Sequence, residues 1–250
     1  MTTAFPSQML HILPTRAELG ALAGAQVAEE LRRLLGTQPS VRMIFAAAPS
    51  QGEMLDALAA ADGVDWTRVE AFHMDEYIGL REDAPQRFGN WLRRSFFERV
   101  PIGSLVLMEP GSDPQQDAVA YAALLAEKPV DIVCLGIGAN GHLAFNDPPA
   151  EFSESLDAKV VELHRASRQQ QVDDGLFATI DDVPTHAITL TIPRLLRATS
   201  LFCCVPGTLK RDAVQRALTG DVAVDSPASI LRNHPSCRLY LDADSAAGLE

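Results

Sequence analysis

Short apolar runs alternate with longer amphipathic stretches along this chain. The apolar runs are rich in residues that favour strands, and the predicted strands are 9–13, 41–46, 68–72, 131–135, 159–163, 187–191, 201–205 and 238–241. The amphipathic stretches have helical spacing and predict helices at 15–35, with Thr15 as N-cap, and at 53–61, 88–100, 115–127, 169–177, 193–197 and 209–218. This alternation predicts an α/β, Rossmann-like fold, a mainly parallel sheet with helices on both faces.

The length and composition fit one globular unit. Because no linker-like stretch interrupts the alternation, we expect residues 1–250 to form a single domain. The chain is 47% hydrophobic and 22% charged, and no apolar run approaches the roughly 20 residues that a membrane span needs. The first residues lack a basic start followed by an apolar stretch, so we expect a cytoplasmic protein.

The net charge limits the classes of partner that we expect the chain to bind. A formal charge of −12 and a pI near 4.9 argue against nucleic acid and against an anionic membrane surface, because both are bound through clustered Lys and Arg. A small phosphorylated substrate could still bind through backbone amides and one or two cations. The four cysteines show no paired metal-ligand spacing and are interpreted as core thiols.

Two loops carry most of the functional signal. Residues 72–80 and 136–149 each begin where an apolar run ends, so each is predicted to follow the carboxyl end of a strand, where α/β folds bind ligands. In the second loop, Asp147 can orient the ring of His142, and Asn140 adds a neutral dipole. A neutral imidazole can take and return a hydroxyl proton near pH 7. The alternative is that His142 only ties the loop to its own backbone.

The second loop also matches a weaker pattern. Gly136, Gly138 and Gly141 follow a strand at the spacing of a dinucleotide-binding loop, with Glu162 at about the distance of a ribose-binding acid. That site needs a helix at the last glycine, whereas residues 146–149, Asn-Asp-Pro-Pro, break the chain. The glycines better serve a turn whose backbone approaches a ligand closely.

The first loop contains two consecutive acids. Asp75 and Glu76 cannot both face the same way on an extended segment, so one is expected to face the cleft. A partly desolvated carboxylate there has a raised pKa and can remove a carbon-bound proton beside a carbonyl. The alternative is a solvated acidic turn. His73 and Asp75 could suggest a metal, but without a third ligand at a persuasive spacing we predict no metal and no cofactor.

These residues resemble a known family. Segments 74–80 and 138–148 look like the two signature loops of glucosamine-6-phosphate deaminases, also called isomerases, and the similarity extends from about 45 to 244. The resemblance implies conversion of an amino-sugar phosphate and water to fructose 6-phosphate and ammonia. It assigns Asp75 as the base that shuttles a proton between carbons 2 and 1 and His142 as the ring-opening base. Asp147 matches the acidic partner of the histidine, often Glu in relatives, and Asn140 matches a position that is Asp or Asn.

The resemblance also implies a phosphate site. Ser50 and Gln51 lie where the family has a Thr-Gly-rich phosphate loop, although the glycines are absent, and Lys210 matches a phosphate-contacting lysine. A family arginine appears here as Asp173, so either Arg165 or Arg168 substitutes or the substrate differs. We predict Arg168 as the phosphate ligand, together with Ser50, Gln51 and Lys210.

The resemblance bears on activation, and the sequence leaves open the configuration of the sugar, the oligomeric state and two alternative functions. Some relatives are activated by an amino-sugar phosphate, but Ala150 and Asp157 stand at two of the positions concerned, with only Lys159 basic, so we predict no such activation. The substrate could be gluco or galacto, and the chain could form a homo-oligomer. The alternative functions are a 6-phosphogluconolactonase-type lactone hydrolase and a non-catalytic regulator that binds sugar phosphates.

Overall fold

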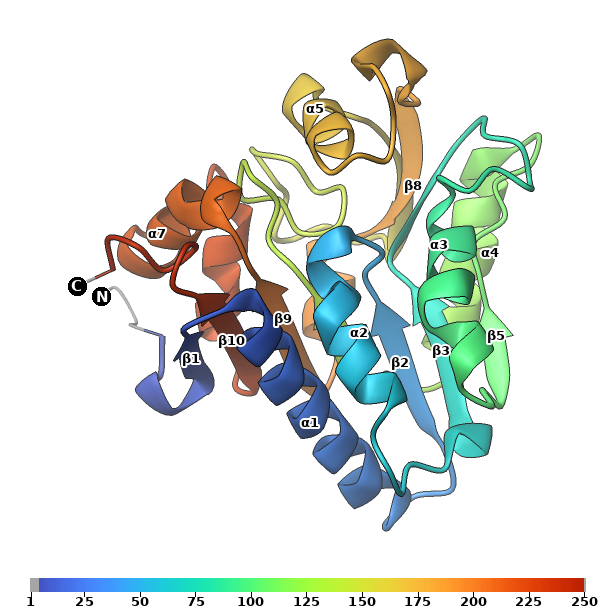
Figure 1. Ribbon diagram of the computed structural model, residues 1–250. Helices are drawn as coiled ribbons and strands as arrows, with labels where there is room; N and C mark the ends of the chain where they lie inside the picture. The colour runs from blue at the N-terminus through green and yellow to red at the C-terminus, as the bar shows by residue number, and fades with distance from the viewer. Residues whose placement is uncertain (1–4, 250) are drawn as a thin grey trace.

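A seven-stranded sheet forms the centre of the protein, in a computed structural model that describes residues 5–249 (Figure 1). All of its strand pairs are parallel, and the strand order is β1-β10-β9-β6-β2-β3-β5. The strands are β1 (Leu10–Leu13), β2 (Val41–Phe45), β3 (Val69–His73), β5 (Ser104–Val106), β6 (Ile132–Leu135), β9 (Ser200–Val205) and β10 (Cys237–Asp242). The predicted α/β fold with a mainly parallel sheet is confirmed.

Helices cover both faces of this sheet. One face carries α1 (Arg16–Leu35), α2 (Gly52–Ala59) and α3 (Phe88–Ser95), and the other carries α4 (Pro114–Ala126), α6 (Ile192–Leu196) and α7 (Arg211–Thr219). Strand β2 shows the alternation, because Met43 packs with the first group of helices and Ile44 with the second. Thr15 caps α1 as predicted, with its hydroxyl accepting from the Glu18 N–H.

A second, antiparallel sheet was not expected from the sequence. It has the order β4-β8-β7 and consists of β4 (Asp75–Tyr77), β7 (Ala158–Glu162) and β8 (His186–Leu190). The predicted strands 159–163 and 187–191 therefore exist but do not join the parallel sheet. The segment 75–77 belongs to the loop predicted after the apolar run 68–72, and its acidic residues, which are depleted in strands, give no sign of β4.

Several element boundaries differ from the prediction. The predicted helix 88–100 stops at Ser95, since Phe96 leaves helical geometry at φ −144°. The helix predicted at 169–177 is α5 (Arg165–Asp173), and Gly175, at φ +76°, follows its end. Strand β5 was not predicted. The 3-10 helices are η1 (Ser7–Met9), η2 (Pro49–Gln51), η3 (Trp66–Arg68), η4 (Phe97–Arg99), η5 (Ile180–Asp182), η6 (Thr208–Lys210) and η7 (Pro227–Asn233).

The strand order fixes where a ligand can bind. From β2 the chain proceeds outward through β3 to β5, whereas from β6 it proceeds through β9 to β10 on the other side. The order therefore reverses between β2 and β6, and such a switch point leaves a crevice at the carboxyl ends of the strands. Within residues 5–249, no helix is both long and apolar enough to cross a membrane.

Candidate active site

A pocket lies at this switch point, at the carboxyl ends of β2, β3, β6 and β9. Its lining residues are Ala46, Ala47, Ala48, Ser50, Gln51, Met74, Asp75, Phe88, Gly136, Ile137, Gly138, His142, Ala144, Gln170, Gln171 and Lys210. Both sequence-predicted loops contribute to it, and so does helix α5. Asp75 and His142, far apart in sequence, face the same pocket.

Asp75 is the acidic side chain of the first loop that faces the pocket. It is 7% exposed, and its carboxylate makes no hydrogen bond within the described residues 5–249. Burial, helped by the neighbouring charge of Glu76, raises the pKa of Asp75 well above its ordinary value. A desolvated carboxylate without a partner is a competent proton acceptor.

Glu76 faces the other way, as expected for consecutive residues of a strand. Its carboxylate accepts from the backbone N–H groups of Tyr77, Phe88 and Gly89 at 2.9, 3.0 and 3.0 Å, and it lies 3.7 Å from the Arg87 guanidinium. It borders a second cavity of about 260 Å³. This cavity is larger than the pocket that contains Asp75. The carboxylate of Glu76, however, already accepts from backbone N–H groups of α3, so Glu76 anchors this helix and does not face a ligand.

The second loop depends on glycine at two positions. Gly141 has φ +95°, which L side chains rarely adopt, and a Cβ on Gly138 would lie 2.2 Å from Nε2 of His142. The imidazole therefore packs directly on the Gly138 backbone. Residues 136–157 contain no helix, so these glycines form a tight turn and do not open a pyrophosphate-binding helix.

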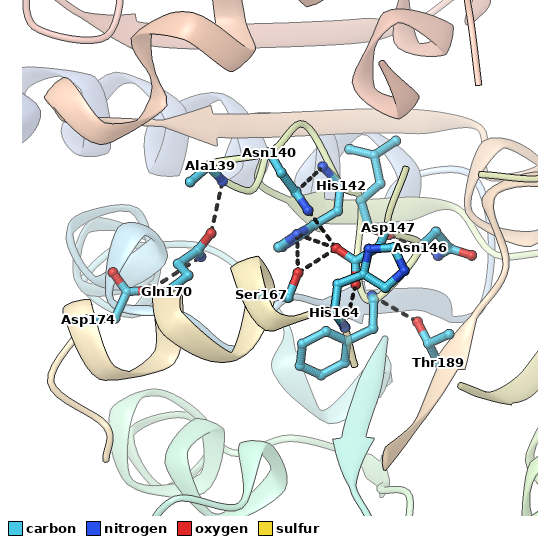
Figure 2. A network of polar contacts seen from close by, with 12 residues as sticks. Ala139, Asn140, His142, Asn146, Asp147, His164, Ser167, Gln170, Asp174 and Thr189 are labelled. Carbon is cyan, nitrogen blue, oxygen red and sulfur yellow. Dashed lines mark hydrogen bonds and ion pairs between the residues drawn. The ribbon is translucent and has the colours of Figure 1, made fainter. Parts of the chain in front are cut away.

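A connected set of hydrogen bonds holds His142 (Figure 2). Asn140 Nδ2 donates to Asp147 Oδ1 at 2.7 Å, and Asn140 Oδ1 accepts from the His142 backbone N–H at 3.1 Å. His142 Nδ1 lies 3.3 Å from Asp147 Oδ1 and 2.9 Å from Ser167 Oγ, and Ser167 Oγ also donates to Asp147. Burial opposes the ionisation of Asp147, but the hydrogen bonds from His142, Ser167 and Asn140 outweigh it, and the pKa of Asp147 falls below its ordinary value.

Helix α5 forms one wall of the pocket. Gln170 Oε1 accepts from the Ala139 N–H at 2.8 Å, which ties the helix to the second loop (Figure 2). Gln171 is only 5% exposed and lines the pocket, yet its side-chain amide makes no hydrogen bond within the described part of the chain. A buried amide without a partner is available to a ligand.

The candidate phosphate residues divide into two groups. Ser50, Gln51 and Lys210 line the pocket. Burial lowers the pKa of Lys210 to about 8, opposed by the nearby charge of Asp174. Arg168 does not reach the pocket, since its guanidinium donates to the backbone carbonyls of Ile180 and Val183.

The prediction that Arg168 binds phosphate is therefore not supported by its position. The side chain points from α5 towards the segment around η5, and carbonyl oxygens already accept from its Nε and Nη2. Arg165, the other cation considered, is exposed and does not line the pocket. Lys210 is the cation that lines this pocket in the described structure.

Sequence reasoning missed three residues of the site: Ser167, Gln170 and Gln171. The helix was predicted to begin at 169, which left Ser167 in a loop, and the glutamines carried no charge to mark them. Polar residues on a helix normally indicate solvent. The burial of Ser167 and Gln171, which are 1% and 5% exposed, is visible only in the structure, so no sequence signal marks these residues.

No metal-binding cluster of three or more His, Cys, Asp or Glu side chains occurs among residues 5–249. The side chain of His73, considered with Asp75 as a ligand, accepts from the Met108 N–H at 2.9 Å and does not line the pocket. Two residues at the positions considered for an activator already have partners: Asp157 accepts from Arg197, and Lys159 is paired with Glu154.

Residues 14–239 match the family of glucosamine-6-phosphate isomerases/6-phosphogluconolactonase, and the chain belongs to this enzyme family. The glucosamine-6-phosphate deaminase of an Exiguobacterium species is 36% identical over 189 residues, which cover 74% of this chain and 72% of that protein. The corresponding protein of Listeria innocua is 32% identical over 227 residues, which cover 90% and 95%.

Solved structures agree on the fold. A structure described as a monomeric glucosamine-6-phosphate deaminase matches with a TM-score of 0.87 and 26% identity, over 95% of this chain and 98% of that one. A 6-phosphogluconolactonase from Shewanella baltica matches with a TM-score of 0.78 and 15% identity, over 96% and 100%. At that identity the second match shows the shared fold alone.

Proposed function

We propose that this protein converts glucosamine 6-phosphate, or a close amino-sugar relative, and water to fructose 6-phosphate and ammonia. The observation that carries the proposal is the meeting of an unpartnered, buried Asp75 carboxylate and the His142 imidazole in one pocket. The two groups belong to different loops and can act on different atoms of one sugar. The relatives that are 36% and 32% identical carry the name of this activity.

Ring opening is assigned to His142. The imidazole takes the proton from the hydroxyl on carbon 1 of the cyclic sugar, the bond between carbon 1 and the ring oxygen breaks, and the proton passes to the ring oxygen. A neutral imidazole suits both halves of this transfer near pH 7. Asp147 and Asn140 hold the loop and ring in place.

Isomerisation is assigned to Asp75. In the open aldehyde the proton on carbon 2 is acidified by the adjacent carbonyl. Asp75 removes this proton while the carbonyl oxygen gains one, which gives an enolamine with a double bond between carbons 1 and 2. Asp75 then returns its proton to carbon 1 and the nitrogen loses one, which balances the proton gained by oxygen and yields an imine at carbon 2. Water then adds to this imine, and ammonia leaves. A carboxylate with a raised pKa is a stronger base towards carbon than an ordinary one, and burial raises the pKa of Asp75 in this way.

The phosphate is assigned to the side of the pocket formed by Ser50, Gln51 and Lys210. Ser50 and Gln51 lie in η2, directly before α2, where backbone N–H groups favour an anion. The unpartnered amide of Gln171 supplies a further neutral donor. The pocket encloses about 60 Å³, below the roughly 300–1,000 Å³ of typical ligand pockets, so a sugar phosphate must extend beyond this space or move the side chains that line it.

An ammonia-release assay tests the proposal directly. The purified chain is incubated with glucosamine 6-phosphate, galactosamine 6-phosphate and their unphosphorylated sugars, and with 6-phosphogluconolactone in a separate hydrolysis assay. We expect ammonia and a ketose phosphate from one of the amino-sugar phosphates, and little turnover without the phosphate. Lactone hydrolysis without ammonia release, or thermal stabilisation by sugar phosphates without any turnover, would replace the proposal with one of the two alternatives.

A further inference from the structure

The hydroxyl of Ser167 contacts both His142 and Asp147. Ser167 belongs to α5, is 1% exposed and does not line the pocket. Its hydroxyl contacts His142 Nδ1 at 2.9 Å and donates to Asp147 Oδ1, whereas the direct separation of His142 Nδ1 and Asp147 Oδ1 is 3.3 Å. The serine therefore makes the closer contact with the ring nitrogen.

The direction of each hydrogen bond follows from the number of protons. A serine hydroxyl has one proton, and an ionised carboxylate only accepts. Because the Ser167 proton is directed to Asp147, its oxygen must accept at Nδ1 of His142, which requires a proton on that nitrogen. In a neutral imidazole the other nitrogen, Nε2, then carries the lone pair. Nε2 lies against Gly138, a lining residue of the pocket.

We propose that Ser167 is a positioning residue that fixes His142 in the tautomer protonated on Nδ1, so that Nε2 is the free base that faces the sugar. This inference rests on the proposed function for its catalytic meaning, but the tautomer itself is a property of the protein without substrate. Ser167 acts through His142 and touches no reacting atom.

Helix α5 gives this role a structural basis. The same helix that carries Ser167 lines the pocket through Gln170 and Gln171, and Gln170 holds the backbone N–H of Ala139 in the histidine loop. The helix thus sets both the wall of the pocket and the protonation pattern of the base. Since Ser167 stays outside the lining, its loss is expected to lower kcat more than it changes KM.

The test compares three variants. Ser167→Ala removes the hydroxyl, Ser167→Thr keeps it, and Ser200→Ala removes a buried hydroxyl that contacts Glu30 away from the pocket. Nitrogen-15 NMR of histidine-labelled protein without substrate reports the tautomer of His142, with a His142→Gln sample to assign the signal. Kinetics of ammonia release and thermal unfolding are measured on the same samples.

The expected pattern is specific. The wild-type protein and the Thr and Ser200 variants show Nδ1-protonated His142. Ser167→Ala shifts the tautomer ratio about tenfold towards Nε2–H, the size of one hydrogen bond, and kcat falls in proportion to the lost population of the Nδ1–H form, with little change in KM. Nε2–H in the wild-type protein, or an unchanged tautomer in folded Ser167→Ala, would overturn the inference. If the tautomer follows Ser167 but no variant releases ammonia, the inference stands and the proposed function fails.

Discussion

At the scale of single residues, the site consists of groups held away from their ordinary solution behaviour. The Asp75 carboxylate is buried without a hydrogen bond in the described chain, the Lys210 ammonium is buried, and the Gln171 amide is unpartnered. Each of these arrangements costs stability in the free protein. Residues that are unfavourable for folding and gather in one pocket are typical of a functional site.

Asp75→Asn is expected to stabilise the protein while it removes the base. Below about pH 3.8, the ordinary pKa of an aspartate, the carboxyl is protonated in the folded and unfolded states, so the pKa shift has no effect. Between this pH and the raised pKa of the folded state, the unfolded chain has lost the proton while the folded protein keeps it, so the free energy of unfolding falls as the pH rises. The melting temperature should therefore increase in the variant, and by more at pH 8 than at pH 5.

Thermal unfolding across this pH range measures the effect. Asp62→Asn is the control, because Asp62 is an exposed aspartate. A gain that is equal at both pH values, or that also appears in the control, would show that the Asp75 carboxylate is not ionised at a cost in the folded protein.

Lys210 should make the affinity for phosphorylated substrates depend on pH. Its pKa is lowered to about 8 by burial, so above this pH the free enzyme loses its pocket cation, and kcat/KM, which reports the free enzyme, should fall. Lys210→Met should raise KM by about tenfold or more, as expected for a charged hydrogen bond, and should remove this alkaline limb. Lys159→Met, which removes a cation paired with Glu154 outside the pocket, is the control. If kcat/KM still falls at alkaline pH in Lys210→Met, a group other than Lys210 causes the fall.

At the scale of elements, the small antiparallel sheet brings the two loops together. Asp75 in β4 is paired in register with Thr189 in β8, and the Thr189 hydroxyl accepts from the Phe145 N–H of the histidine loop at 3.0 Å. Asn146 adds a hydrogen bond to the carbonyl of Leu190 at the end of β8. Strand β8 thus fixes the position of Asp75 relative to the loop that carries His142.

The apolar pattern of the sequence predicts some of these features, and others depend on contacts between distant residues. The central strands β2, β6 and β9 of the parallel sheet are buried throughout, so their apolar runs identify them. The loops after β3 and β6 follow from their position at the ends of such runs, whereas the short and partly exposed β5 gives no such signal. The acidic strand β4 and the serine of α5 acquire their roles from partners far along the chain. Periodicity carries no information about such contacts, which is why Ser167 and the position of Arg168 emerged only from the structure.

Close packing of α1 on α2 positions the predicted phosphate side of the pocket. A Cβ on Gly24 would lie 2.8 Å from the Met54 carbonyl oxygen and 2.9 Å from the Leu58 nitrogen. Gly24→Ala should therefore destabilise the protein, because overpacking costs about 1–3 kcal/mol and exceeds the roughly 1 kcal/mol that alanine adds within a helix. Gly52→Ala, where the new Cβ meets nothing within 4 Å, should instead stabilise by about 0.4–1 kcal/mol.

Chemical denaturation measures both changes. Equal effects of the two substitutions would mean that α1 and α2 do not approach as closely as described. Displacement of α2 should also raise KM in Gly24→Ala, because Ser50 and Gln51 directly precede this helix.

At the scale of the whole molecule, the order of strands explains why chemistry gathers in one place. The order reverses between β2 and β6, and the loops after β2, β3, β6 and β9 converge at that edge. The family and its fold account for this framework, and one lysine and the neutral glutamines of α5 line the pocket in the described chain. The proposed ring opening and the proposed proton shuttling lie on two segments, far apart in sequence, that only the folded chain brings together.

The rate of ammonia release by Asp75→Asn, with the binding of substrate measured in parallel, tests this account most directly. We expect binding to be nearly unchanged and kcat to fall by about a hundredfold or more, as when a positioned general base is lost. Turnover that equals that of the wild-type protein would remove Asp75 from the mechanism and contradict the account.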